Sequence, residues 1–171
     1  MRKTPVDAFD YANDITKALE KGVLLTTKAG EKINSMVIGW GHVGRIWERP
    51  VFVAYVRKNR HTLQMLDQNP EFTVNVPLGR LDKKTFAVCG TESGRDVDKI
   101  AKAGLTPVEP EVVSVPGLKE CPLTLECRVL YREEQTFSRL PEDIRRRFYA
   151  VEPEDHVACF GEIVASYRIE D

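Results

Sequence analysis

The sequence predicts a mainly β protein, an antiparallel sheet curled into a barrel with α-helices at its flanks. Segments with the alternating or continuous apolar pattern of strands outnumber segments with the spacing of helices. The connections between them are short, which favours antiparallel pairing over parallel βαβ units. No repeat, low-complexity tract or linker interrupts the 171 residues, so we expect one domain over residues 1–171.

The first elements are a helix and a hairpin. Apolar residues at helical spacing predict an amphipathic helix over residues 7–20, which Gly22 ends. Residues 23–27 and 32–39 flank a glycine-bearing turn and therefore predict two paired strands.

The middle of the chain continues with a strand, a helix and a strand. Residues 50–56 are apolar on both faces, which indicates a strand buried on both sides. A short helical pattern over residues 61–68 ends at the Asn69-Pro70 pair. The following residues, 72–76, predict another strand.

A further helix is expected over residues 93–103. Residues 106–115 predict an extended segment at a sheet edge, because their two prolines cannot donate to a central ladder. Residues 123–131 alternate most clearly, and we interpret them as a strand that turns Thr124 and Glu126 toward solvent.

The last segments are a charged excursion and a long strand. The excursion, residues 141–149, includes three arginines at 145–147, interpreted as a solvated helix face, with contact to a nicotinamide dinucleotide as the alternative. Residues 156–169 predict the final strand. Gly161 within it fits a bend, a β-bulge or the close approach of another backbone.

The composition excludes several classes of partner. A formal net charge of -1 provides no basic surface for nucleic acid. The polar first residues lead into no apolar signal region, and the longest apolar run, residues 51–56, is too short to span a bilayer. We therefore expect a cytoplasmic protein without a nucleic-acid or membrane partner.

The cysteines, histidines and serines form none of the common catalytic patterns. The four cysteines are scattered without a C-x-x-C pair, so we expect reduced thiols and no zinc site. The three histidines are too dispersed to predict a metal site, and no G-x-S-x-G motif supports a serine hydrolase.

Two segments carry residues suited to the parts of a nucleotide-like ligand. Residues 57–62 combine two arginines, a lysine and a threonine just before a helix, where side chains and helix N–H groups can hold a phosphate. Residues 34–41 end in glycines around Trp40 and, with Met36, offer flat and polarisable surfaces to a planar ring. The alternatives are a solvated basic turn and ordinary core residues.

A third such segment is CGTESGRDVDK, residues 89–99. Ser93 and Asp96 form a capping pair for the expected helix, while Gly90 and Gly94 allow a ligand to approach the backbone closely. The acidic side chains would repel a phosphate, which favours neutral acceptors such as ring carbonyls. The alternative is an ordinary capped helix.

Together these segments resemble the flavin reductase family, and within it the flavoredoxin-like branch. The similar segments lie in the order of the family and cover the chain from about residue 22 to residue 167. They are NSMVIGW (34–40), RPVFVAYVRKNRHT (49–62), FTVNVP (72–77), CGTESGRDVDK (89–99) and DHVACFGEIV (155–164). Where members of the branch commonly carry an aromatic residue, this chain has His61.

The resemblance implies an FMN-binding split β-barrel of six strands in Greek-key order, which forms a homodimer with FMN held non-covalently near the interface. It assigns the phosphate to Arg57, Arg60 and Thr62. It makes His156 the residue near a docked nicotinamide and the candidate catalytic residue. The remaining expected cofactor contacts are Asn34, Met36, Ile38, Gly39, Trp40, Cys89, Gly90, Ser93, Gly94, Arg95, Asp96 and Lys99.

The implied function is that of a flavin reductase-like oxidoreductase. FMN would take a hydride from NADH or NADPH and pass electrons to a second flavin, a quinone or a redox partner protein. Because the flavin carries the chemistry, the absence of an acid–base dyad agrees with this function. Two alternatives stay open: a flavoredoxin-type electron-transfer protein without a nicotinamide site, and a split-barrel module that binds haem, another small ligand or a partner protein. The helix over residues 7–20 and Trp47 are candidates for the dimer face.

Overall fold

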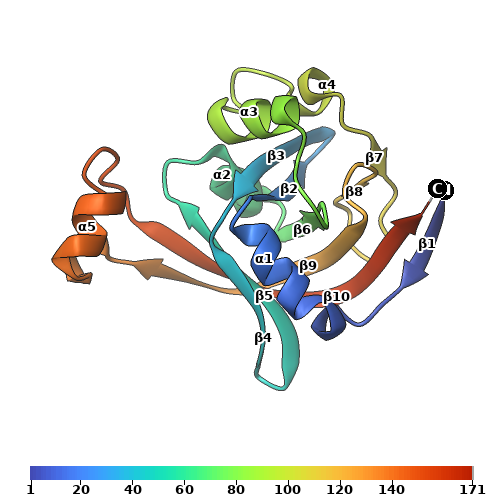
Figure 1. The fold of residues 1–171 in the computed structure, drawn as a ribbon, viewed down its shortest axis with the longest axis horizontal. Coiled ribbons are helices and arrows are strands. Elements are labelled where there is room, and N and C mark those ends of the chain that lie inside the picture. The colour runs from blue at the N-terminus through green and yellow to red at the C-terminus, as the bar shows by residue number, and fades with distance from the viewer. Residues whose placement is uncertain (171) are drawn as a thin grey trace.

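The computed structural model describes residues 1–170, and its main element is one antiparallel sheet of eight strands with helices at its flanks (Figure 1). Seven strands follow the order β3-β2-β6-β9-β10-β5-β4, and β1 pairs with β10. A short ladder of β7 with β8 lies outside this sheet. The strands are β1 (Arg2–Pro5), β2 (Val23–Ala29), β3 (Lys32–Ile38), β4 (Gly41–Ile46), β5 (Arg49–Arg57), β6 (Glu71–Val76), β7 (Pro107–Val108), β8 (Gly117–Leu118), β9 (Leu123–Gln135) and β10 (His156–Glu170).

The expected count of six strands is wrong for this sheet, which has eight in the described residues. The sequence pattern missed β4 and β1. Gly41 and Gly44 interrupt the apolar alternation in β4, and β1 is a four-residue edge strand. The other six strands of this sheet lie where the apolar patterns predicted them.

The sheet curls until its two end strands meet. β3 and β4 are the outer strands of the ordered path, yet they follow one another in the chain and are joined by Gly39 and Trp40 alone. Within residues 1–170 no ladder pairs β3 with β4, although the Tyr55 N–H donates to the Trp40 carbonyl at 3.3 Å. The barrel therefore has an open seam beside these two residues.

The inside of the curled sheet holds the main hydrophobic core. Phe52 and Phe72 are fully buried in it, together with the inward side of β9 and β10. Gly161 lies against this core, because a Cβ there would come within 2.5 Å of Phe72 Cζ. The register with β9 also shifts between Phe160 and Gly161. The predicted bulge at Gly161 is confirmed, whereas the close neighbours are the side chains of Phe72 and Cys127 and not another backbone.

Two of the expected helices are confirmed. The first begins as a 3₁₀ turn, η1 (Ala8–Tyr11), capped by the Asp7 carboxylate, and continues as α1 (Ala12–Leu19). α2 (His61–Gln68) ends at Asn69, as predicted. Ile15 and Leu66 face the core from these helices.

The helix expected over residues 93–103 is wrong in extent. The chain instead forms α3 (Lys83–Thr91) and α4 (Lys99–Ala103), whose N-caps are Asp82 and Asp98. The Ser93 hydroxyl accepts the Arg95 N–H at 3.2 Å within the turn between them, so Ser93 caps no helix. The two aspartates cap these helices instead, because each carboxylate accepts the backbone N–H of the residue three positions later.

The predicted solvent face of β9 is wrong at Thr124 and Glu126, which are both fully buried. The Glu126 carboxylate accepts N–H groups from residues 111–113 at 2.6–3.0 Å. The segment expected to be extended over residues 106–115 pairs only at Pro107–Val108 and otherwise folds across this face. A buried carboxylate is tolerated there because three backbone donors satisfy it.

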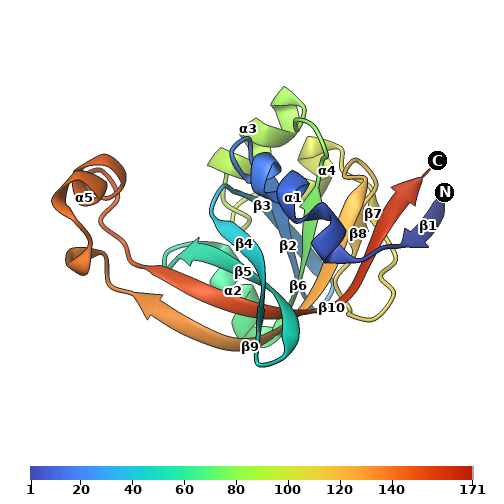
Figure 2. The same cartoon turned by 60° about the horizontal axis from the view of Figure 1, so that its bottom comes forward.

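The charged excursion projects from the body of the sheet at the tip of the β9–β10 hairpin (Figures 1 and 2). It contains α5 (Glu142–Phe148), and a 3₁₀ turn, η2 (Phe137–Arg139), precedes it. Arg146 and Arg147 are exposed as expected, whereas Arg145 is half-buried.

None of the helices in the described part of the chain combines the length and the apolar character needed to cross a membrane.

Candidate functional site

A pocket of about 340 Å³ opens at one end of the barrel, beside the seam between β3 and β4. Its walls are the end of β3 with the Gly39-Trp40 link, the turn between β5 and α2, and the end of α3 with the loop that follows. A volume of this size is typical of small-molecule sites. The predicted site residues that line it are Asn34, Met36, Ile38, Gly39, Trp40, Arg57, Arg60, Thr62, Cys89, Gly90, Ser93, Gly94, Arg95, Lys99 and His156.

Asp96 is the predicted site residue that does not line this pocket. It is exposed and borders a neighbouring hollow with Glu31 and Lys32. The cause is the wrong helix start, since the turn after Ser93 directs Asp96 to the outer side of the loop.

The structure adds lining residues that sequence reasoning missed. They include Asn59 and His61, whose place in the turn of residues 57–62 was a usable signal, and Val37 and Tyr55, for which only the strand register decides orientation. Thr91 and Glu92 also line the pocket, and their place within the segment of residues 89–99 was likewise a usable signal.

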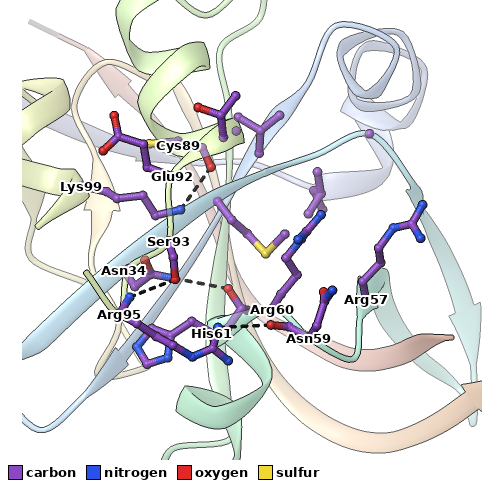
Figure 3. A pocket seen from close by; sticks show the side chains of 18 of the residues that line it. Asn34, Arg57, Asn59, Arg60, His61, Cys89, Glu92, Ser93, Arg95 and Lys99 are labelled. Carbon is purple, nitrogen blue, oxygen red and sulfur yellow. Dashed lines mark hydrogen bonds between the residues drawn. The ribbon is translucent and has the colours of Figure 1, made fainter. Parts of the chain in front are cut away.

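Four cationic side chains approach the pocket from opposite sides. Figure 3 shows Lys99 on the side of α3 and α4, Arg95 beside His61 and Asn59, and Arg57 and Arg60 on the side of β5. Lys99 is only 4% exposed, and its ammonium donates to the Cys89 carbonyl at 3.2 Å. Burial lowers the pKa of Lys99. Such a concentration of positive charge suits an anionic ligand.

Arg95 ties the two sides together. Its Nε donates to Gln64 Oε1 and its Nη1 to the Asn59 carbonyl, both at 3.2 Å. The loop after α3 is thereby attached to the turn before α2 and to α2 itself. Segments remote in sequence thus form one wall.

Two buried polar atoms of this wall have no hydrogen-bond partner in the described residues, Asn34 Oδ1 and His61 Nε2. Asn34 is 2% exposed and uses its Nδ2 on Thr62 Oγ1 at 3.4 Å. Gly94 packs against both, because a Cβ there would lie 2.0 Å from Asn34 Oδ1 and 3.3 Å from His61 Cδ2. A buried acceptor left unpaired costs about 1–3 kcal/mol, so this site is prepared for a donor on a ligand.

The arginines of the β5–α2 turn contact a single segment, residues 148–152. Arg57 donates to the Phe148 carbonyl at 2.7 Å and to the Glu152 carbonyl at 2.5 Å. Arg60 pairs with both Glu152 carboxylate oxygens, at 3.0 and 3.1 Å. The turn predicted to hold a phosphate therefore holds a carboxylate of the same chain.

An aromatic group closes the side of the pocket next to the seam. The Trp40 ring lies 4.7 Å from the His156 ring and 5.3 Å from the Phe148 ring. The Tyr149 hydroxyl and His156 Nδ1 are 2.8 Å apart. Burial, helped by the charges of Arg57 and Arg60, lowers the pKa of His156 to about 4, so the imidazole is neutral near pH 7.

Comparison with known proteins agrees with this geometry. The model of the flavin reductase like domain matches residues 19–171. A protein of Archaeoglobus fulgidus is 36% identical over 135 residues, which cover 78% of this chain and 71% of that protein. The chain belongs to the flavin reductase family, in its flavoredoxin-like branch.

Solved structures share the fold. The flavoredoxin of Methanosarcina acetivorans has a TM-score of 0.66 and 30% identity, with 88% of this chain and 69% of that chain covered. The NADH:FAD oxidoreductase of Streptomyces globisporus has a TM-score of 0.62 and 19% identity, with 86% of this chain and 75% of that chain covered. At this lower identity the likeness concerns the fold alone.

The depressed pKa of His156 predicts a pH dependence of stability. Below pH 6.5 the unfolded chain protonates this imidazole, whereas the folded chain does so only near pH 4. The unfolded state therefore binds more protons in this window, and the free energy of unfolding falls as the pH falls, by at most roughly 3 kcal/mol at pH 4.

Urea denaturation of the His156→Gln variant at pH values between 4.5 and 7 checks this prediction. The free energy of unfolding of this variant should lack the part of the pH dependence that His156 contributes. His42→Gln, at an exposed histidine of β4, is the matched variant for the loss of one imidazole. If the free energy of unfolding of His156→Gln depended on pH as strongly as that of the unaltered protein, the lowered pKa of His156 would be contradicted.

Proposed function

We propose that the pocket binds FMN and that the protein passes a hydride from NADH or NADPH to this flavin and electrons on to an acceptor. The observation that carries the proposal is the meeting of residues 57–62 and 89–99 around one cavity, with Arg95 bonded across it. Residues 57–62 supply cationic side chains. Residues 89–99 supply backbone that a ligand can approach closely at Gly90 and Gly94. This is the division that a phosphate and a flat, carbonyl-bearing ring require.

The residues present fit such a group. Arg60, Arg95 and Lys99 provide positive charge for a phosphate and for the electron-rich edge of a ring. The unpaired Asn34 Oδ1 offers an acceptor to a ligand N–H or O–H. Met36 and Trp40 line the same cavity with polarisable surfaces.

FMN supplies the hydride and electron-transfer chemistry when it is bound. The chain binds the cofactor, orients it and limits its contact with water. His156 is neutral near pH 7 and its Nδ1 is engaged with the Tyr149 hydroxyl, so it presents an uncharged ring beside Trp40. This suits contact with a planar ring.

Two similar proteins of solved structure support the proposal. The Methanosarcina acetivorans relative, 30% identical, is a flavoredoxin, and the Streptomyces globisporus structure is an NADH:FAD oxidoreductase. A nicotinamide donor and the acceptor, whether a second flavin, a quinone or a protein, are parts of the proposal.

One observation favours a second candidate, an electron-transfer protein without a nicotinamide site. The residue expected beside the nicotinamide, His156, lies in an aromatic group with Trp40 and Phe148. Rings packed in this way oppose the entry of another ring unless the group opens. Electrons would then reach the flavin from a partner protein.

Absorption spectra distinguish the candidates. The protein reconstituted with FMN should show flavin bands shifted from those of free FMN, and anaerobic stopped-flow mixing with NADH or NADPH should bleach them on the timescale of turnover. Bleaching by dithionite but by neither nicotinamide would select the electron-transfer candidate. A protein that retains no flavin after gel filtration would contradict both.

Substitution of Gly94 tests whether the loop after α3 takes part in FMN binding. Gly94→Ala places a methyl group 2.0 Å from Asn34 Oδ1, so the loop or the amide must move. We expect the Kd for FMN to rise at least about tenfold, which corresponds to about 1.4 kcal/mol. Fluorescence titration with FMN measures this change.

Gly44→Ala is the matched control, because the atom nearest to its new Cβ is His42 Cδ2 at 3.8 Å, an ordinary contact. It should bind FMN like the unaltered protein. Equal FMN affinity of a folded Gly94→Ala variant would show that the loop at Gly94 is not part of the FMN site.

We also propose that the protein is a homodimer. An exposed aromatic patch supports this: Trp47, Tyr131 and Phe160 lie 5.6–6.1 Å apart, and the first two are 52% and 46% exposed. Trp47 and Glu48 form a two-residue hairpin turn with positive φ of 51° and 57°. Asn-Gly suits such a turn far better, so Trp47 occupies this position at a cost in stability that a contact with a second copy would offset.

Trp47→Asn tests the dimer while it favours the turn. We expect the dimer dissociation constant to rise roughly 30-fold, since a central Trp contributes about 2 kcal/mol to an interface. Sedimentation equilibrium measures it, with Glu48→Asn in the same turn as the control that retains dimerisation. A monomeric unaltered protein, or equal association of both variants, would contradict the proposal.

A further inference from the structure

The turn that faces the pocket with arginines is already paired with an anion of the same chain, the carboxylate of Glu152. Arg60 holds both carboxylate oxygens, at 3.0 and 3.1 Å. Asn59 Nδ2 donates to Oε1 at 2.8 Å, and Arg57 Nε lies 3.5 Å from Oε2. A phosphate held by this turn would need the same donors.

The segment that carries Glu152 has a separate attachment. Arg57 donates to the carbonyls of Phe148 and Glu152, and these two bonds do not involve the carboxylate. Arg57 is mostly buried, with 14% of its side chain exposed, whereas 34% of the Glu152 side chain and 43% of the Arg60 side chain are exposed. The carboxylate can therefore leave Arg60 and turn to solvent while the backbone of the segment stays anchored.

The carboxylate is charged under ordinary conditions. The hydrogen bond from Asn59 and the charges of Arg60 and Arg57 lower the pKa of Glu152, against the opposing effect of burial. A charged Glu152 cancels part of the positive charge of the turn, while the Arg95 guanidinium and the Lys99 ammonium donate to uncharged oxygens. The two sides of the pocket thus differ in how readily they accept an added anion.

We propose that Glu152 is an internal competitor for the phosphate group of the flavin nucleotide, and that it sets how strongly the site prefers FMN to riboflavin. Binding exchanges one anion for another: Arg60 and Asn59 release the carboxylate and take the phosphate oxygens. Arg57 is a positioning residue that keeps the segment of residues 148–152 attached to the end of β5 throughout. The inference rests on the proposed FMN site.

The Glu152→Gln variant tests the exchange, because it removes the charge and keeps the shape. FMN should bind more tightly, with a Kd lowered about 2- to 5-fold, as expected for removal of one partly exposed charge pair. Riboflavin, which carries the same ring without a phosphate, should bind with an unchanged Kd. Quenching of flavin fluorescence gives both constants in one buffer.

Glu154→Gln is the matched control. It makes the same charge change two residues away, on an exposed side chain that has no bond to Arg57, Asn59 or Arg60 in the described residues. It should leave the Kd of both flavins unchanged. Urea denaturation of each variant verifies that the fold is retained.

The outcomes separate the competitor from other roles. Weaker or unchanged FMN binding by Glu152→Gln would overturn the inference, because Glu152 would then orient the arginines or play no part. A parallel gain for riboflavin would also overturn it, since the effect would not concern the phosphate. Failure of the unaltered protein to bind either flavin would instead refute the proposed function, and the inference with it.

Discussion

The pocket depends on the curl of a single sheet. β3 and β4 are its two outer strands, but the chain joins them through only Gly39 and Trp40, so the sheet must bend round until they meet. Gly161, packed on Phe72 at a bulge, allows the long strand β10 to follow this bend. Because the seam stays unpaired, the end of β3 and the turn after β5 face each other across a cavity instead of a ladder.

The loop after α3 completes the cavity through polar contacts. Arg95 bonds to Gln64 and to the Asn59 carbonyl, and Gly94 packs on Asn34 and His61. The wall formed in this way keeps Asn34 Oδ1 and His61 Nε2 buried and unpaired. Such groups reduce the stability of the folded chain, which is the usual sign of a surface prepared for a ligand.

The sequence pattern predicted most of the sheet because burial of one strand face leaves a period of two, and burial of both faces leaves a continuous apolar run. It failed where a tertiary contact changed the environment of a residue. Thr124 and Glu126 alternate with apolar neighbours as solvent-facing residues do, yet residues 111–113 cover Glu126 with three N–H donors. The sequence pattern did not predict β4, because its glycines carry no side chain that could show a period.

For the site, the sequence by itself determined which side chains can meet a ligand: the arginine turn, the glycine-bearing loop and the Met36–Trp40 strand end are local and retain their chemistry in any packing. Only the tertiary structure decided what each of them faces. It turned Asp96 away, replaced the Ser93 cap by Asp98, and set Glu152 against Arg57 and Arg60. Local patterns record the propensity and polarity of neighbours in the chain, whereas the pairing of charges some 90 residues apart depends on how the β9–β10 hairpin returns to the end of β5.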